Sequence, residues 1–112
     1  AWNGALDNGK DPRGQNGENP DLNNTTVTEF YKLFPDNRNS TPPDNTKGYM
    51  FYDATNDNVD NPTHVEFYDN TNSNANTFIE NRTGGITPPV PTEREMNDER
   101  NSNWTFVPLP DL

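Results

Sequence analysis

The chain has no cysteine, one histidine and three serines in 112 residues. Without cysteine it can form neither a disulfide framework nor a thiolate metal site. The single histidine, His64, and the serines in asparagine-rich stretches match no nucleophile and base arrangement, and no phosphate-binding glycine loop is present. These absences predict a protein that is not an enzyme, with no catalytic residue.

Long apolar runs are also absent. No stretch approaches the ~20 residues needed to cross a bilayer, so we expect no membrane insertion. Valine, isoleucine, leucine and phenylalanine make up 18 of the 112 residues, and the formal net charge is −10. Such a composition borders on that of disordered chains. It predicts that neighbouring subunits, cations, glycans or the rest of a larger polypeptide help to order the chain. The alternative is a compact domain with long, hydrogen-bonded loops.

Basic residues are few, with 8 lysines and arginines against 18 aspartates and glutamates. Scattered positive charges in this number cannot neutralise many phosphates. The composition therefore argues against a nucleic-acid partner.

Polar and apolar residues alternate in three stretches, 48–53 (GYMFYD), 64–70 (HVEFYDN) and 76–83 (NTFIENRT), which predicts strands with turns between them. In the first two, a phenylalanine-bearing face would pack on a core and leave the tyrosines outside. A helix is predicted over 25–36, where Val27, Phe30, Tyr31 and Phe34 share one face, although a strand competes there.

The predicted fold is mainly β. It is a small antiparallel meander or sandwich-like sheet with long Asn- and Pro-rich loops, one or two short helices and extended terminal arms. Residues 1–24 form an extended arm anchored by Trp2, Leu6 and Leu22, residues 25–90 a β-rich body with one short helix, and residues 91–112 a short helix followed by an apolar C-terminal arm. Pro108 and Pro110 limit that last stretch to an edge strand or an arm.

The sequence FYDxTNxN occurs twice, beginning at Phe51 and at Phe67. One interpretation is structural: a strand ends and an Asx turn begins. The other is a calcium loop, because oxygen-bearing residues alternate from each aspartate as they do in such loops. The candidate calcium ligands are Asp53, Asp57, Asp69, Thr71, Ser73 and Glu80.

Acceptor sequences for N-glycosylation, Asn-x-Ser/Thr, occur at five positions. Chance alone predicts about 3 in a chain so rich in asparagine, serine and threonine, so the excess is slight. In a secreted protein they would mark exposed loops. The candidates are Asn23, Asn24, Asn39, Asn81 and Asn103.

The function that these features favour is a structural subunit or segment of an extracellular assembly, such as a virion surface or a pilus-like filament. Its partners would be copies of itself or other subunits. The predicted interface residues are Trp2, Trp104, Phe106, Val107 and Leu109. The alternative is a calcium-stabilised or carbohydrate-binding surface module in which exposed Trp2, Tyr52, Tyr68 or Trp104 stacks on a sugar.

Overall fold

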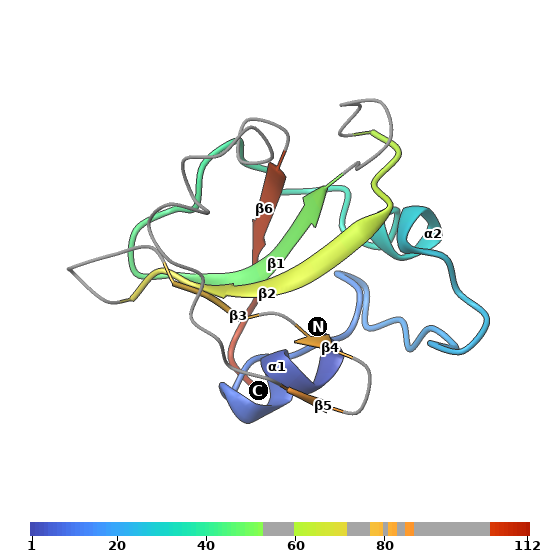
Figure 1. Cartoon of the computed structure of the whole chain (residues 1–112), viewed down its shortest axis with the longest axis horizontal. Helices are drawn as coiled ribbons and strands as arrows, with labels where there is room; N and C mark the ends of the chain where they lie inside the picture. Colours follow the sequence, from blue (N-terminus) through green and yellow to red (C-terminus); the bar gives the residue numbers. More distant parts are fainter. Residues whose placement is uncertain (53–59, 72–76, 80, 83–84, 87–103) are drawn as a thin grey trace.

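The computed structural model describes residues 1–52, 60–71, 77–79, 81–82, 85–86 and 104–112 (Figure 1). In chain order the elements are α1 (Trp2–Asp7), α2 (Val27–Tyr31), β1 (Lys47–Tyr52), β2 (His64–Asp69), β3 (Thr77–Ile79), β4 (Asn81–Arg82), β5 (Gly85–Ile86) and β6 (Trp104–Pro108). The prediction of a small, mainly β protein with one or two short helices is confirmed, although α1 is not one of the helices predicted.

The main sheet has four antiparallel strands in the order β3-β2-β1-β6, and β4 and β5 form a separate pair. The three predicted strand stretches appear as β1, as β2, and as β3 with β4. In the register of β1 and β2, Tyr49 lies opposite Phe67 and Met50 opposite Glu66. The C-terminal strand β6 crosses to the other side of β1, which makes β1 an inner strand (Figure 1).

One face of the sheet packs against both helices. Phe30 and Phe34 from the α2 region meet the ring of Tyr49 at centroid distances of 5.3 Å each, in edge-to-face geometry. Phe51 packs against Tyr31 at 4.8 Å. Edge-to-face ring pairs of this kind add to the stabilisation from burial itself. Aromatic rings thus form much of a core in a chain with few aliphatic side chains.

Helix α2 lies within the predicted stretch 25–36 but is shorter, since it runs only from Val27 to Tyr31. The Thr26 side chain accepts a hydrogen bond from the Glu29 backbone N–H at 3.1 Å, which satisfies one of the first free donors of the helix. At its other end, Arg38 donates to the carbonyl oxygens of Phe34 (2.7 Å) and Tyr31 (3.0 Å). The Arg38 guanidinium also lies 3.7 Å from the centre of the Tyr31 ring.

Helix α1 differs from the extended arm predicted for this segment. The stretch has weak helix propensity because it contains asparagine and glycine, but tertiary contacts stabilise it. Ala5 is fully buried, and a Cβ on Gly4 would lie 3.0 Å from Phe67 Cβ, so the helix approaches β2 closely at that point. Trp2 packs on the core as expected. Leu6 and Leu22 are exposed and do not anchor the segment.

The other face of the sheet holds a second cluster of buried side chains: Met50, Tyr68, Trp104 and Phe106, with Tyr52 beside them. The prediction that the tyrosine face would be left outside is therefore wrong for Tyr68, which is fully buried. Its hydroxyl lies 2.8 Å from Thr46 Oγ1, which satisfies the polar end of the side chain. Both faces of β1 are consequently covered.

The C-terminal stretch is an outer strand, as the prolines predicted, and it returns to its own chain. Leu109 N–H donates to the Lys47 carbonyl at 3.0 Å, and Leu112 N–H donates to the Gly9 carbonyl at 3.0 Å. Both ends of the chain accordingly lie on the same side of the molecule (Figure 1). The helix predicted before this strand falls on residues outside the described part.

The radius of gyration is 12.9 Å, close to the roughly 13 Å typical of a globular domain of this length. The chain's own residues form the two described clusters. The scarcity of aliphatic side chains is thus offset by aromatic rings on both faces of one sheet.

Candidate functional site

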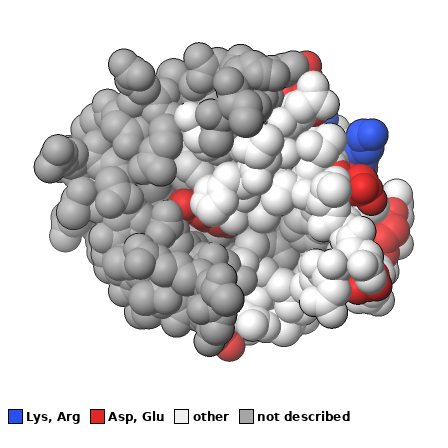
Figure 2. Space-filling view, turned by 45° about the vertical axis from the view of Figure 1, so that its right-hand side comes forward, with Lys and Arg blue, Asp and Glu red and all other residues white. Residues whose placement is uncertain are grey.

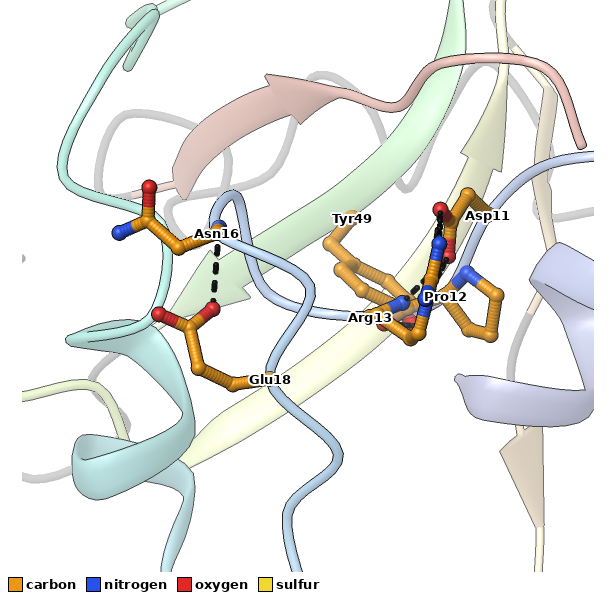
Figure 3. Close-up of polar contacts among 6 residues, drawn as sticks. All are labelled: Asp11, Pro12, Arg13, Asn16, Glu18 and Tyr49. Atoms are coloured by element: carbon orange, nitrogen blue, oxygen red, sulfur yellow. Dashed lines mark hydrogen bonds and ion pairs between the residues drawn. The ribbon is translucent and has the colours of Figure 1, made fainter.

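A loop of residues 9–18 lies across one face of the sheet (Figure 3). It contacts β1, the C-terminal stretch and the segment after α2. Its Pro12 carbonyl oxygen accepts a hydrogen bond from the buried Tyr49 hydroxyl at 2.9 Å. Its Asp11 N–H donates to the Pro110 carbonyl at 2.8 Å. The loop is therefore fixed both to β1 and to the C-terminal stretch.

Asp11 and Arg13 form a bidentate pair on this loop. Arg13 Nε and Nη2 lie 3.0 Å and 2.8 Å from the two carboxylate oxygens of Asp11, and the Arg13 backbone N–H donates to Asp11 at 3.0 Å. The hydrogen bonds from the Arg13 side chain, and then from its backbone, hold the pKa of Asp11 below its ordinary value. Two residues that flank a proline thus close a small ring in the loop.

The second half of the loop is a glycine turn. Glu18 accepts a hydrogen bond from the Asn16 backbone N–H at 3.0 Å, and Gly17 has a φ of 80°, a left-handed conformation that glycine adopts without strain. Hydrogen bonds from its own backbone N–H and from Asn16 lower the pKa of Glu18. The side chain of Gln15 joins this turn to the segment after α2, because it exchanges two hydrogen bonds with the Asp36 backbone at 2.7 and 2.9 Å.

A small cavity of about 200 Å³ opens between this loop and the C-terminal stretch. Its lining combines apolar residues, Phe34, Leu109 and the neighbouring prolines, with the polar residues Asp11, Arg13 and Gln15. A second cavity, of about 210 Å³, lies beside α1 and α2. It is lined by Ala1, Trp2, Leu22, Thr25, Thr26, Val27, Phe30 and Val65.

His64 begins β2, as its place at a strand end predicted, and pairs with a neighbouring carboxylate. Its Nε2 lies 2.9 Å from Glu66 Oε1. Glu66 is buried, whereas the His64 ring is half exposed. The carboxylate of Glu66 fixes the orientation of the His64 ring. The pair links two side chains that lie two residues apart on β2.

Of the candidate calcium ligands, only Asp69 and Thr71 lie in the described residues. Asp69 Oδ1 accepts hydrogen bonds from the Thr71 backbone N–H at 2.9 Å and from its hydroxyl at 2.5 Å. Lys47 Nζ lies 3.7 Å from Asp69 Oδ2. The two hydrogen bonds between Asp69 and Thr71 form the Asx turn that the structural interpretation of the repeat predicts. Among the described residues no three histidine, aspartate or glutamate side chains gather as a metal site would require. The remaining candidates, Asp53, Asp57, Ser73 and Glu80, lie outside the described part.

Three of the candidate glycosylation sites have described side chains, and they differ in access. Asn23 and Asn24 are exposed, and Asn24 Nδ2 donates to Asp21 at 2.7 Å. Asn39 Nδ2 donates to Asn37 and to the Phe106 carbonyl, and the Asn39 backbone exchanges two hydrogen bonds with Phe106. Both the side-chain amide and the backbone of Asn39 are therefore engaged in hydrogen bonds with β6. Asn81 begins β4, and Asn103 lies outside the described residues.

The predicted interface residues are used within the chain. Trp104, Phe106, Val107 and Leu109 are each no more than 6% exposed, and they belong to the two core clusters. Within a single chain these four side chains are buried against β1 and the two clusters, and their role in a contact with a neighbour stays a prediction. Trp2 is partly buried against the first cluster. Asp11 and Arg13 were not predicted as site residues, although their spacing around Pro12, between the Asn8-Gly9 and Asn16-Gly17 pairs, is a signal of a turn.

No protein family model, no curated protein and no solved structure matches this chain. Within the part that the structure describes, no helix has the length and apolar character of a membrane span.

Proposed function

We propose that this chain is a non-catalytic structural subunit of an extracellular assembly, with copies of itself or other subunits as partners. The observation that carries the proposal is how the candidate site uses its polar groups. Asp11, Arg13 and Gln15 all bond to the chain's own side chains and backbone. These side-chain contacts fix the shape of the loop and join it to the segment after α2. The Pro12 carbonyl and the Asp11 N–H join the same loop to β1 and to the C-terminal stretch, which is a structural role.

Surface charge supports partners other than nucleic acid. In Figure 2 the described part of one face carries a basic area beside several acidic ones. Exposed asparagines in acceptor sequences, such as Asn23 and Asn24, fit a secreted protein. The outer position of β6 in the sheet supplies an element through which subunits can join.

The proposal is tested by the mass of the purified chain in solution. Size-exclusion chromatography with light scattering, over a hundredfold range of concentration, is expected to show oligomers that grow with concentration. Analytical ultracentrifugation on the same samples gives an independent mass. A species that keeps the monomer mass at every concentration would overturn the proposal.

A carbohydrate-binding role is the second candidate, and the second cavity favours it. Tyr68 and Trp104 are buried and offer no ring face to a sugar. Trp2, by contrast, is partly exposed at a cavity that also contains Thr25 and Thr26, and an aromatic ring beside hydroxyl groups is a common sugar-binding arrangement. A glycan array compared between the wild type and W2A tests this candidate, because binding that is equal in both would exclude the Trp2 cavity.

A calcium-stabilised form of the subunit rests on the ligand spacing from Asp69. Isothermal titration calorimetry of the chain after removal of bound cations with a chelator would detect it. A D69N variant identifies the site, since it keeps the shape of the side chain and removes its charge.

A further inference from the structure

We propose that subunits join by exchanging the C-terminal segment 104–112, so that β6 of one copy pairs with β1 of a second copy. This inference rests on the proposed assembly role and names its contact surface. The surface is the outer side of β1, together with Asn39 and the loop around Lys10. The partner that fits it is another copy of this chain.

The first support is that the segment 104–112 binds as one unit at a defined position. We call this position, along residues 48–52 of β1, the seat of the segment. Five residue pairs join it to β1, from Gly48 opposite Pro108 to Tyr52 opposite Trp104. Beyond the strand, Leu109 N–H donates to Lys47 and Leu112 N–H donates to Gly9. Each of these contacts can be made equally well by a segment that arrives from another molecule.

The second support is that the fold depends on this segment. It supplies Trp104 and Phe106 to one core cluster, and Val107 and Leu109 to the other. An emptied seat would expose Tyr49, Met50 and Phe51, which are all fully buried. In a chain with so few aliphatic residues, an unfilled seat is costly. Two copies that exchange segments lose none of these contacts, which is why domain swapping is a low-cost route to oligomers.

The third support is reach. Seventeen residues, 87–103, separate β5 from β6, and a chain of that length spans at most about 56–61 Å. The longest dimension of the molecule is 34 Å. The connection is therefore long enough to deliver the segment to an adjacent copy.

The Lys10 and Asp111 pair provides a direct test. The two residues form an antiparallel bridge, and their side chains make an ion pair of 2.6 Å. Directly opposed residues of this kind have Cα separations that a disulfide can span. The chain has no native cysteine, so two single variants, K10C and D111C, report on this contact alone. Both side chains reach the surface, so the substitutions are expected to cost little stability.

The experiment mixes K10C with an affinity-tagged D111C in denaturant, refolds them together at high concentration and oxidises them. Exchange is expected to join a tagged and an untagged chain by a disulfide in about half of the dimers. Each variant refolded alone measures random cross-linking, and K10S mixed with D111S controls for loss of the ion pair. Cross-linking of the mixture no higher than that of the separate variants would overturn the exchange.

The double variant K10C/D111C separates this proposal from the broader one. Its oxidation within one chain locks the segment onto its own β1, and we expect the oxidised protein to remain monomeric while the reduced protein assembles. If the oxidised variant assembles as well as the wild type, the exchange is wrong and the assembly role stands. If the wild type itself is monomeric at every concentration, both proposals fail.

Discussion

A Cβ atom on Gly48 would lie 2.0 Å from the carbonyl oxygen of Val107 and 2.8 Å from Pro108 Cα. Both are backbone atoms of the C-terminal segment, so no side chain can move aside to make room. The close contact between β1 and β6 at this point therefore requires glycine.

The G48A variant should displace the end of β6. We expect the free energy of unfolding to fall by about 1–3 kcal/mol, the usual range for overpacking, as measured by urea denaturation. The matched control is K32A, which changes an exposed residue at the end of α2. Equal stability of G48A and the wild type would mean that β6 does not approach β1 as described.

Removal of the Tyr49 hydroxyl should destabilise the loop around Asp11. In Y49F the Pro12 carbonyl loses its donor, and a buried acceptor without a partner costs about 1–3 kcal/mol. Y68F is the comparison, because Thr46 Oγ1 keeps a second partner in the Pro43 carbonyl at 2.6 Å. Hydrogen exchange of the Asp11 amide should accelerate in Y49F and stay unchanged in Y68F. Faster exchange in both variants would contradict this local effect.

Stability should decline at alkaline pH because of the buried tyrosines. Burial raises the pKa of Tyr68 to about 12, from an ordinary value of 10.0, although the hydrogen bond with Thr46 opposes the shift. Burial raises the pKa of Tyr49 further in the same direction. Since the folded state binds the phenolic proton more tightly, the stabilisation is complete below pH 10 and is lost as pH rises towards 12. Urea denaturation at increasing pH, with tyrosinate absorbance, would show it, and Y68F should weaken the decline.

Arg13 and Arg38 should respond differently to substitution by lysine. R38K keeps a charge but loses the planar contact with Tyr31 and the paired hydrogen bonds to two carbonyl oxygens, and we expect a loss of about 1–2 kcal/mol. R13K alters an ion pair at an exposed position, which is expected to cost about 0–1 kcal/mol. Thermal unfolding in low and high salt distinguishes them, because only the Arg13 effect should shrink with salt. The reverse order would contradict the role given to Arg38.

The sequence predicted those elements whose local signals agree with their packing. β1 and β2 lie where alternation placed them, and α2 begins at the Thr26 cap. Helix α1 was missed because its residues do not favour a helix, and contacts with β2 that no local pattern shows hold it in place. The burial of Tyr68 was missed for a related reason. The alternation of residues along a strand indicates that the sheet has two faces, but it does not show whether one face or both are covered.

The candidate site was harder to predict than the fold. Trp104 and Phe106 were predicted to face a neighbouring subunit, and within one chain they are buried. An apolar pattern in a sequence does not identify the surface that covers it. For Asp69 and Thr71 the turn interpretation agrees with the observed hydrogen bonds. The pairing of Lys10 with Asp111 joins positions 101 residues apart, and nothing in a single sequence connects them.

In a mutational scan of most surface strands, tolerance to polar substitutions alternates between successive positions. Because both faces of β1 are covered, this strand should not show that alternation. From Gly48 to Phe51 every position is buried, so polar replacements should be rejected at each one in turn. Selection on this strand would then act on four consecutive codons, and natural variation would be confined to its two ends.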